Sequence, residues 1–155
     1  MNYTVIVPFY NEAKNISSFN YELINNLKKI DNGKRNLEII YVDDGSSDET
    51  FNELKKLSIN TVETLIIKHR TNLSQSAAIN TGIGQSKYEN IVIMDGDLQN
   101  DPNDLAKMVS EFEKGTDMLI GWRKHRKDNF FLRTLPSTIA NFIVRLFSRS
   151  KIHDH

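Results

Sequence analysis

The stretch IVIMDGDLQ, residues 91–99, is the part of the sequence that decides the fold class. Its first four residues form an apolar run of the kind found in the buried strands of parallel sheets. Acidic residues follow directly where this strand is expected to end. Because ligands of open α/β sheets bind at the carboxyl ends of the strands, Asp95 and Asp97 are predicted to face a ligand.

The spacing of Asp95 and Asp97 favours a shared cation. Residues two apart in an extended segment point the same way, so both carboxylates can bind one ion. Such oxygen ligands suit Mg²⁺ or Mn²⁺, which commonly take one or two carboxylates together with phosphate oxygens. Gly96 between them is expected to let a ligand approach the backbone closely. The pattern indicates a metal-bound diphosphate, and a solvated acidic loop is the alternative.

Two other apolar runs also end in polar loops. They are YTVIV (3–7) before PFYNE (8–12), and LEIIYV (37–42) before DDGSSD (43–48). Pro8 cannot donate to a sheet ladder, so it fits a strand end. The second loop has a further interpretation, because Ser46 and Glu49 have the spacing of a capping box for the helix that carries Phe51 and Leu54.

Strands and helices alternate along the rest of the chain. Apolar side chains at spacings of three and four predict a helix over residues 16–30. The other expected elements are strands at 63–68 and 117–121, a helix at 76–86, and a helix that begins at Asp101 and Pro102 and buries Leu105, Met108, Val109 and Phe112. This order predicts one α/β domain over residues 1–155, with helices on both faces of a mainly parallel sheet.

The charges are unevenly distributed along the chain. The net charge is zero, yet residues 122–151 contain eight Lys or Arg and one acid. This basic segment indicates an anionic partner such as a diphosphate, a lipid phosphate or a membrane surface, and a solvated basic helix is the alternative. The amphipathic stretch 135–149 is too short and too polar to span a membrane. No cysteine, P-loop or Ser-His-Asp pattern is present, and no nucleic-acid partner is expected.

The ordered motifs resemble the family 2 inverting glycosyltransferases of GT-A fold. They are VPFYNE (7–12), VDDGS (42–46), MDGDLQ (94–99) with Asp101-Pro102, and GWR (121–123). The likeness is closest to the branch that moves a sugar from a nucleoside diphosphate sugar to dolichyl or undecaprenyl phosphate, and it covers essentially the whole chain. The resemblance implies a GT-A-type, Rossmann-like fold and a nucleoside diphosphate sugar as donor, with a UDP-sugar favoured over GDP-mannose. It also implies a polyprenyl phosphate acceptor at the cytoplasmic side of the membrane.

The resemblance also implies a role for individual residues. The expected nucleotide-binding residues are Pro8, Tyr10, Glu12, Asp43, Asp44 and Asp95. The expected ligands of Mg²⁺ or Mn²⁺ are Asp95, Asp97 and Gln99, and the expected catalytic residues are Asp97, Arg123, Arg133 and Asp154. Gln75 is interpreted equally well as a nucleotide contact and as an exposed first residue of a helix. Ser74 before it stands where related enzymes carry glycine.

The carboxyl terminus is expected to be incomplete. The chain stops at IHDH, residues 152–155, which resembles the start of the acceptor-site motif of the family. We therefore expect a soluble, truncated domain that binds the donor but transfers little sugar, with the missing region approaching the membrane. Three alternatives stay open: a donor-binding fragment without catalysis, a family 2 enzyme acting on a polysaccharide, and, less favoured because PFYNE replaces a glycine-rich loop, a sugar nucleotidyltransferase.

Overall fold

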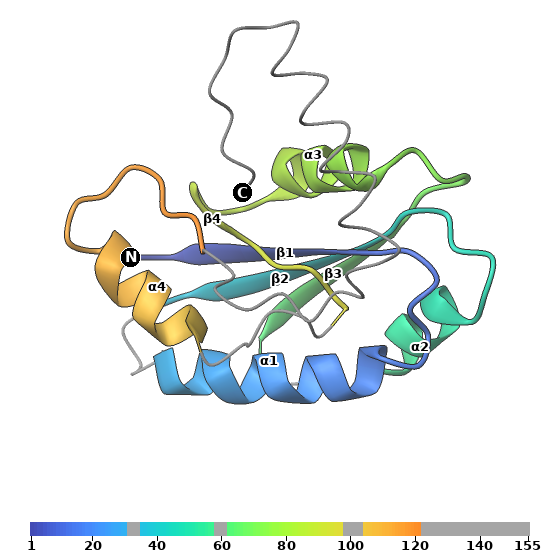
Figure 1. The fold of residues 1–155 in the computed structure, drawn as a ribbon, viewed down its shortest axis with the longest axis horizontal. Helices are drawn as coiled ribbons and strands as arrows, with labels where there is room; N and C mark the ends of the chain where they lie inside the picture. Colours follow the sequence, from blue (N-terminus) through green and yellow to red (C-terminus); the bar gives the residue numbers. More distant parts are fainter. Residues whose placement is uncertain (31–34, 58–61, 98–103, 122–155) are drawn as a thin grey trace, which may run out of the picture. The chain divides into compact units, whose positions relative to one another are not determined.

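The computed structural model describes residues 1–30, 35–57, 62–97 and 104–121 (Figure 1). Its elements, in chain order, are β1 (Tyr3–Phe9), α1 (Ile16–Ile30), β2 (Leu37–Asp43), α2 (Thr50–Lys56), β3 (Glu63–Lys68), α3 (Gln75–Gln85), β4 (Asn90–Ile93) and α4 (Asp104–Phe112). All eight lie within the compact unit Met1–Leu119. The predicted alternation of strands and helices is confirmed for these elements.

The four strands form one parallel sheet in the order β3-β2-β1-β4. Val5 of β1 lies opposite Ile39 of β2 on one side and Val92 of β4 on the other. Every residue of β1 is buried, as expected for a central strand covered on both faces. The predicted parallel sheet is therefore confirmed for this part of the chain.

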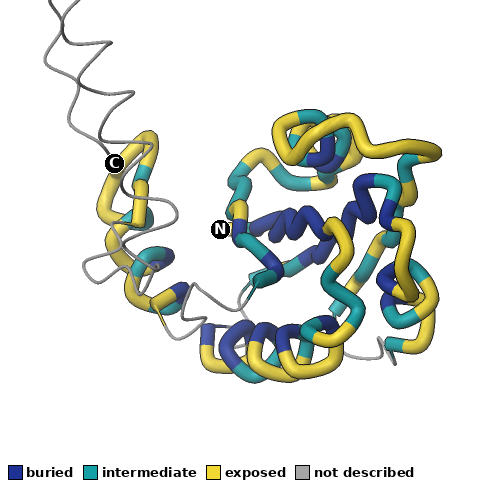
Figure 2. The backbone as a smooth tube through the Cα atoms, turned by 45° about the vertical axis from the view of Figure 1, so that its right-hand side comes forward, coloured by how far each residue is buried: buried dark blue, intermediate teal, exposed yellow. Residues whose placement is uncertain are grey.

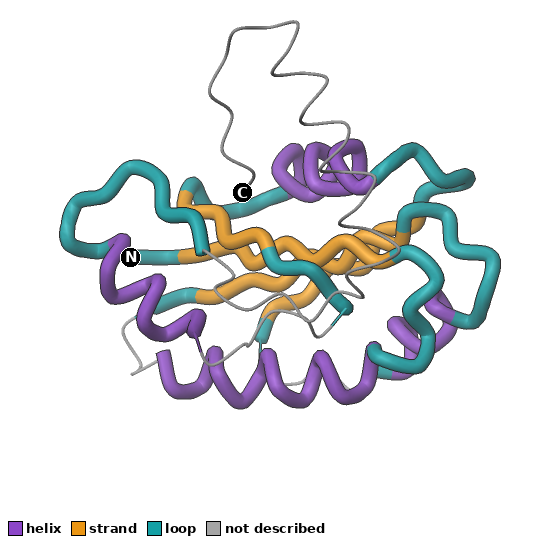
Figure 3. The backbone as a smooth tube through the Cα atoms, in the orientation of Figure 1, coloured by secondary structure: helices purple, strands orange, loops and turns teal. Residues whose placement is uncertain are grey.

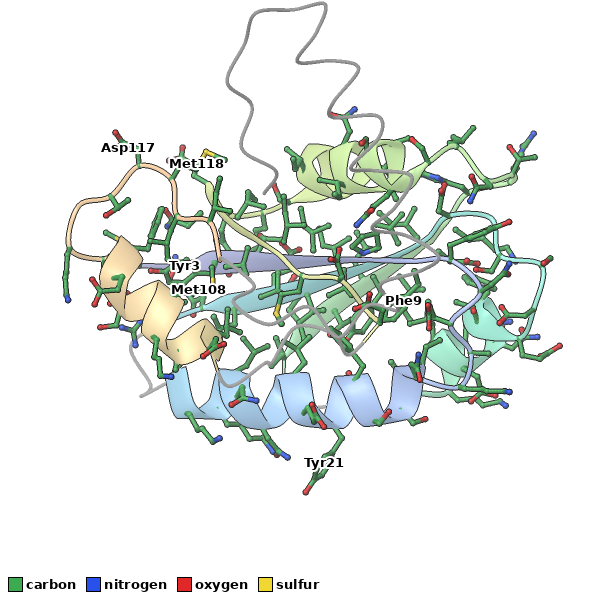
Figure 4. All side chains as sticks on the ribbon, in the orientation of Figure 1. Tyr3, Phe9, Tyr21, Met108, Asp117 and Met118 are labelled. Carbon is green, nitrogen blue, oxygen red and sulfur yellow. The ribbon has the colours of Figure 1, made fainter. Side chains whose placement is uncertain are left out.

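Helices cover both faces of the sheet, as predicted (Figures 1 and 3). Alternate residues of a strand point to opposite faces. Val5 and Val7 accordingly join the apolar cluster that contains α1, whereas Ile6 packs with Ala78 of α3. The buried side of α1 faces the sheet and its outer side is exposed (Figure 2). Tyr21, which is 69% exposed, projects from that outer side (Figure 4).

The predicted strand at 117–121 is wrong. These five residues form no strand and pair with none of the described strands. Met118 and Ile120 are 74% and 76% exposed. A short apolar run forms a strand only where a neighbouring strand supplies hydrogen bonds to the backbone, and the described residues provide no such neighbour here.

Pro8 lies where its missing N–H breaks no bond of the sheet. β4 ends at Ile93, opposite Ile6, and Met94 N donates to Ile6 O at 3.1 Å. Two residues further along the same edge of β1, the nitrogen of Pro8 faces the side on which β4 has already ended. β1 therefore extends past the end of β4.

Two glycines of α3 provide a matched test of the packing between α3 and the sheet. A Cβ at Gly82 would meet Ile6 Cγ2 at 2.5 Å, whereas a Cβ at Gly84 has nothing within 4 Å. Gly82→Ala should lower the free energy of unfolding by about 1–3 kcal/mol through overpacking. Gly84→Ala should be neutral or raise it by up to about 1 kcal/mol, since alanine favours helix more than glycine. Urea unfolding of both variants measures the difference, and equal effects would contradict this packing.

Candidate functional site

The loops that follow β1 and β2 are joined by hydrogen bonds. Asn11 N donates to Ser46 Oγ, Ser47 N to Asn11 Oδ1 and Glu12 N to Thr50 Oγ1, each at 2.9 Å. Asn11 has a φ of 55°, a left-handed conformation that asparagine tolerates better than most residues. The two predicted polar loops therefore form one structural unit, from which Tyr10 projects with 49% of its surface exposed.

The capping-box interpretation of Ser46 and Glu49 is wrong. α2 begins at Thr50, so Glu49 occupies the N-cap position and makes no side-chain capping bond. The hydroxyl of Ser46 instead accepts from Asn11 N. Asp48 provides the hydrogen bond at the start of α2, since its Oδ1 accepts from Thr50 N at 3.0 Å. Contacts with a distant loop, which local spacing cannot reveal, decide the role of Ser46.

Asp43 is a fully buried carboxylate with one oxygen left open. Its Oδ1 accepts from Ser46 N at 3.0 Å. Its Oδ2 is buried, and no hydrogen-bond donor among the described residues reaches it. The ammonium of Lys68 lies 3.6 Å from Oδ2. The Asp43 carboxylate is therefore buried at the carboxyl end of β2, with Ser46 N on one oxygen and the Lys68 ammonium beside the other.

Asp44, the next residue, is instead fully engaged by the protein. Its Oδ1 accepts from Leu73 N and its Oδ2 from Ser74 N, both at 2.9 Å, and His69 Nδ1 lies 2.7 Å from Oδ1. Burial alone would raise the pKa of the Asp44 carboxyl, but these hydrogen bonds offset burial and lower that pKa. Asp44 therefore holds the segment that connects β3 to α3.

The histidine that contacts Asp44 continues this connection into α3. His69 Nε2 lies 2.9 Å from Thr81 Oγ1, so the imidazole joins the end of β2 to the second turn of α3. His69 and Thr81 were not among the predicted site residues, because neither belongs to a recognisable motif. This half-buried histidine, with a partner on each ring nitrogen, connects the two segments.

The segment before α3 requires two unusual backbone conformations. Ser74 has a φ of 107° and caps α3, accepting from Ala77 N. This confirms that Ser74 occupies a position suited to glycine, and its bond to Asp44 helps to hold the strained conformation. Gly45 has a φ of 68°, and a Cβ there would lie 2.2 Å from the carbonyl carbon of Thr71. Gly45 is thus required for the close approach of the two loops.

The first residue of α3 contacts the acidic loop after β4. Gln75 Nε2 donates to Asp95 Oδ1 at 2.6 Å. Gln75 is therefore both an exposed helix-start residue and a neighbour of the predicted site, and its contact with a nucleotide stays a prediction. Asp95 and Asp97 are both half-buried. The structure thus brings together Gln75, the first residue of α3, and Asp95, in the loop after β4.

Gly96 packs closely against an aromatic side chain. A Cβ at this position would lie 2.1 Å from the Phe9 ring, so this contact requires glycine, and the expected approach of a ligand stays a prediction. Phe9 packs edge-on against Phe19 at 5.7 Å between ring centroids and lies between the sheet and α1 (Figure 4). Its ring therefore anchors the loop of Asp95 and Asp97 over the end of β1.

Several predicted site residues lie outside the described residues, namely Gln99, Arg123, Arg133 and Asp154, together with Asp101, Pro102 and the stretch 135–149. Within residues 1–30, 35–57, 62–97 and 104–121, no three His, Cys, Asp or Glu side chains gather as metal ligands. None of the helices in these ranges has the length and apolar character needed to cross a bilayer.

The carboxylate of Glu12, another predicted nucleotide-binding residue, accepts a hydrogen bond from Asn15 Nδ2 at 2.6 Å, just before α1 begins.

The contribution of Asp44 to stability should depend on pH. Asp44→Asn should lower the free energy of unfolding by about 1–3 kcal/mol near neutral pH. Because the pKa of Asp44 is lowered in the folded protein, its contribution is present above the unfolded pKa of about 3.9 and is lost as the pH falls through the folded pKa. Urea unfolding at decreasing pH should show the difference between wild type and variant narrowing. The exposed Asp104→Asn is the control, and a difference independent of pH would contradict the role of Asp44.

Comparison with known proteins gives a consistent result. The family described as glycosyl transferase family 2 matches residues 4–154. Dodecaprenyl-phosphate galacturonate synthase of Rhizobium johnstonii is 37% identical, over 98% of this chain and 45% of its own length. Undecaprenyl-phosphate 4-deoxy-4-formamido-L-arabinose transferase of Proteus mirabilis is 30% identical, over 95% of this chain and 44% of its own length. The chain thus spans less than half the length of these relatives.

Solved structures show the same fold. TarS of S. aureus in complex with UDP has a TM-score of 0.55 and 27% identity, over 83% of this chain and 40% of that one. The mannosyltransferase PcManGT from Pyrobaculum calidifontis, in complex with GDP-Man and Mn²⁺, has a TM-score of 0.56 and 28% identity, over 69% of this chain and 31% of that one. The predicted GT-A-type fold is confirmed. The two relatives named above are polyprenyl-phosphate sugar transferases, and the chain belongs to glycosyl transferase family 2.

Proposed function

We propose that this chain binds a nucleoside diphosphate sugar, with uridine favoured, for a metal-dependent, inverting transfer to a polyprenyl phosphate. The observation that carries the proposal is the open, buried oxygen of Asp43 at the carboxyl end of β2. A neutral N–H of a nucleobase could supply the hydrogen bond that this oxygen lacks, since the Lys68 ammonium beside it lies at 3.6 Å. The family to which the chain belongs makes a nucleotide sugar the natural source of that N–H.

The loop of residues 8–12 supplies the other proposed contacts with the nucleoside. Tyr10, half exposed on the loop joined to residues 46–50, is placed to stack against a base. Pro8 and Glu12 fix the course of this loop, the first through its ring and the second through its bond with Asn15. Asp44 acts indirectly, since its oxygens hold the segment before Gln75.

We propose that Asp95, Asp97 and Gln99 hold Mg²⁺ or Mn²⁺ against the diphosphate. Two half-buried carboxylates two residues apart suit a cation that shares its ligands with phosphate oxygens. The mannosyltransferase structure that contains GDP-Man and Mn²⁺ supports the use of a divalent ion. Such an ion supplies neutralisation of the charge that develops on the leaving diphosphate. Gln75 and Asp95 then lie at the diphosphate side of the nucleotide.

The acceptor assignment rests on the relatives, which act on dodecaprenyl and undecaprenyl phosphate by their names. A phosphate monoester is already anionic near neutral pH, so attack on the anomeric carbon needs little help from a base. Arg123 and Arg133 are proposed to orient phosphates, because a guanidinium pairs with two phosphate oxygens at once. Asp154 is proposed to act at the acceptor, at the cytoplasmic surface of the membrane.

The role of Asp43 can be tested by nucleotide binding. Asp43→Ala removes the only acceptor proposed for the base, and losing such a charged partner costs roughly 1.5–3 kcal/mol. The affinity for UDP should therefore fall about ten- to a hundredfold in calorimetry. The exposed Glu49→Ala, in the same loop region, should bind normally, and circular dichroism checks that both variants fold. Unchanged binding by Asp43→Ala would remove the observation on which the proposal rests.

The metal assignment predicts cooperative binding. Because the diphosphate completes the shell of the ion, Mn²⁺ should strengthen UDP binding by about 1–3 kcal/mol, and Asp97→Asn should remove most of this coupling. Calorimetry with Mn²⁺ or with EDTA measures it, with Asp104→Asn as the control. In the intact protein, UDP-sugars, Mn²⁺ and undecaprenyl phosphate should yield a lipid-linked sugar that Asp97→Asn fails to form. Equal UDP affinity with and without metal would exclude this arrangement.

A further inference from the structure

His69, the residue that follows β3, is bonded at its backbone and at both nitrogens of its ring. We propose that His69 is a positioning residue, which fixes the orientation of α3 and so holds the Gln75 side chain against Asp95. This inference rests on the proposed function, because Asp95 is one of the proposed ligands of the metal ion. It gives His69 a part in the metal site without any contact with the ion.

The ring of His69 is held at the end of the sheet. Its backbone N–H donates to the carbonyl oxygen of Asp43 at 2.9 Å, which extends the pairing of β3 with β2 beyond Lys68. Its side chain is 9% exposed, and Nδ1 lies 2.7 Å from Oδ1 of Asp44, whose side chain is 3% exposed. The fold therefore fixes the ring relative to β2.

The partners of the ring also determine where its proton lies. Burial of the Asp44 carboxyl raises its pKa, but hydrogen bonds from the protein outweigh burial and lower it. The carboxylate is therefore ionised near neutral pH and can only accept, so Nδ1 of His69 must donate to it. In the neutral ring, Nε2 then accepts from the hydroxyl of Thr81, 2.9 Å away. The imidazole thus links a fixed carboxylate to α3 in one defined tautomer.

α3 is attached to this network at two places. Ser74, the N-cap residue of α3, donates its N–H to Oδ2 of Asp44, and Thr81 lies about two turns further along the helix. The packing of α3 on the sheet is apolar, and apolar packing is not directional. A helix attached at one place can still turn about its axis, whereas a second attachment two turns away opposes this rotation. His69 therefore supplies the attachment that sets the orientation of the helix.

The orientation of α3 determines where its first side chain lies. Gln75 begins the helix, and its Nε2 donates to Oδ1 of Asp95 at 2.6 Å. A residue that hydrogen-bonds to a metal ligand orients that ligand, and its loss commonly weakens metal binding about 10–100-fold. If α3 rotates, Gln75 moves away from Asp95, which then loses this orientation. The bonds of His69 thus act on the proposed metal site through Gln75.

Two substitutions break only the attachment at Thr81. Thr81→Val removes the hydroxyl but retains the branched shape, and His69→Asn retains an N–H for Asp44 but is too short to reach Thr81. Thr81→Ser keeps the hydroxyl and should behave as wild type. Ser86→Ala is the control for helix stability, because Ser86 Oγ donates to Ile83 O at 2.8 Å at the other end of α3.

Calorimetry of UDP binding with Mn²⁺ or with EDTA tests the inference, and the ratio of the two affinities is termed the Mn²⁺ enhancement. Wild type should show an enhancement of about 5- to 150-fold. Thr81→Val and His69→Asn should lower it at least about threefold and leave the affinity in EDTA unchanged, because the proposed contacts with the nucleoside lie outside α3. Thr81→Ser and Ser86→Ala should keep the wild-type enhancement. Thermal unfolding establishes that each variant is folded at the temperature of measurement.

A double-mutant cycle tests whether the effect passes through Gln75. Gln75→Ala alone should lower the Mn²⁺ enhancement, and Thr81→Val should then lower it no further, since both substitutions act on the same contact. Nitrogen NMR of the protein without metal or nucleotide provides a second readout. It should show the neutral ring of His69 with its proton on Nδ1.

Additive effects in the cycle, or a neutral His69 with its proton on Nε2, would overturn the inference. An unchanged enhancement in Thr81→Val, or the same loss in Ser86→Ala, would overturn it as well. Each of these outcomes leaves the proposed function intact. Wild type that binds UDP equally with and without Mn²⁺ would instead overturn the proposed metal site, and wild type that binds no UDP would overturn the proposed function itself.

Discussion

The site depends on two adjacent carboxylates at the end of β2, Asp43 and Asp44, which differ in how many hydrogen bonds the protein gives them. Asp44 turns into the protein, where backbone N–H groups and His69 engage both of its oxygens. Asp43 keeps one buried oxygen without a donor among the described residues. The ammonium of Lys68, 3.6 Å away, offsets part of the cost of burying this charged oxygen. The hydrogen bonds of Asp44 thus fix the loops around Asp43, the residue proposed to contact the ligand.

The rest of the site is assembled from the same edge of the sheet. Hydrogen bonds join the loops after β1 and β2, the Phe9 ring packs where Gly96 leaves room, and Gln75 contacts Asp95. Each of these contacts joins segments that are distant in sequence, and together they place loops on a buried, rigid sheet. Sites that depend on a fixed geometry benefit from such support, because their side chains are already ordered before the ligand arrives.

The parts of the structure that follow from local pattern were predicted well. The apolar runs of β1 to β4 and the periodicity of α1 identify these elements, because burial against a sheet imposes those patterns directly. The prediction of a fifth strand was wrong, because the apolar run at 117–121 has no partner strand among the described residues. The capping box failed because Ser46 bonds to Asn11 in another loop. The contact between Gly96 and the Phe9 ring was not predicted, because it joins segments that meet only in the fold.

By itself, the sequence determined the class of fold, the family, and the strand ends at which polar residues gather. Apolar runs and the order of the motifs can both be recognised from the order of residues alone. Only the tertiary structure decided what each polar residue does. In the fold, Asp44 holds the segment before α3, whereas Asp43 keeps one oxygen without a hydrogen bond among the described residues. The fold also places His69 beside Thr81, and Lys68 beside Asp43. The reason is physical: the state of a buried polar group depends on which donors reach it, and these donors come from segments that meet only when the chain folds.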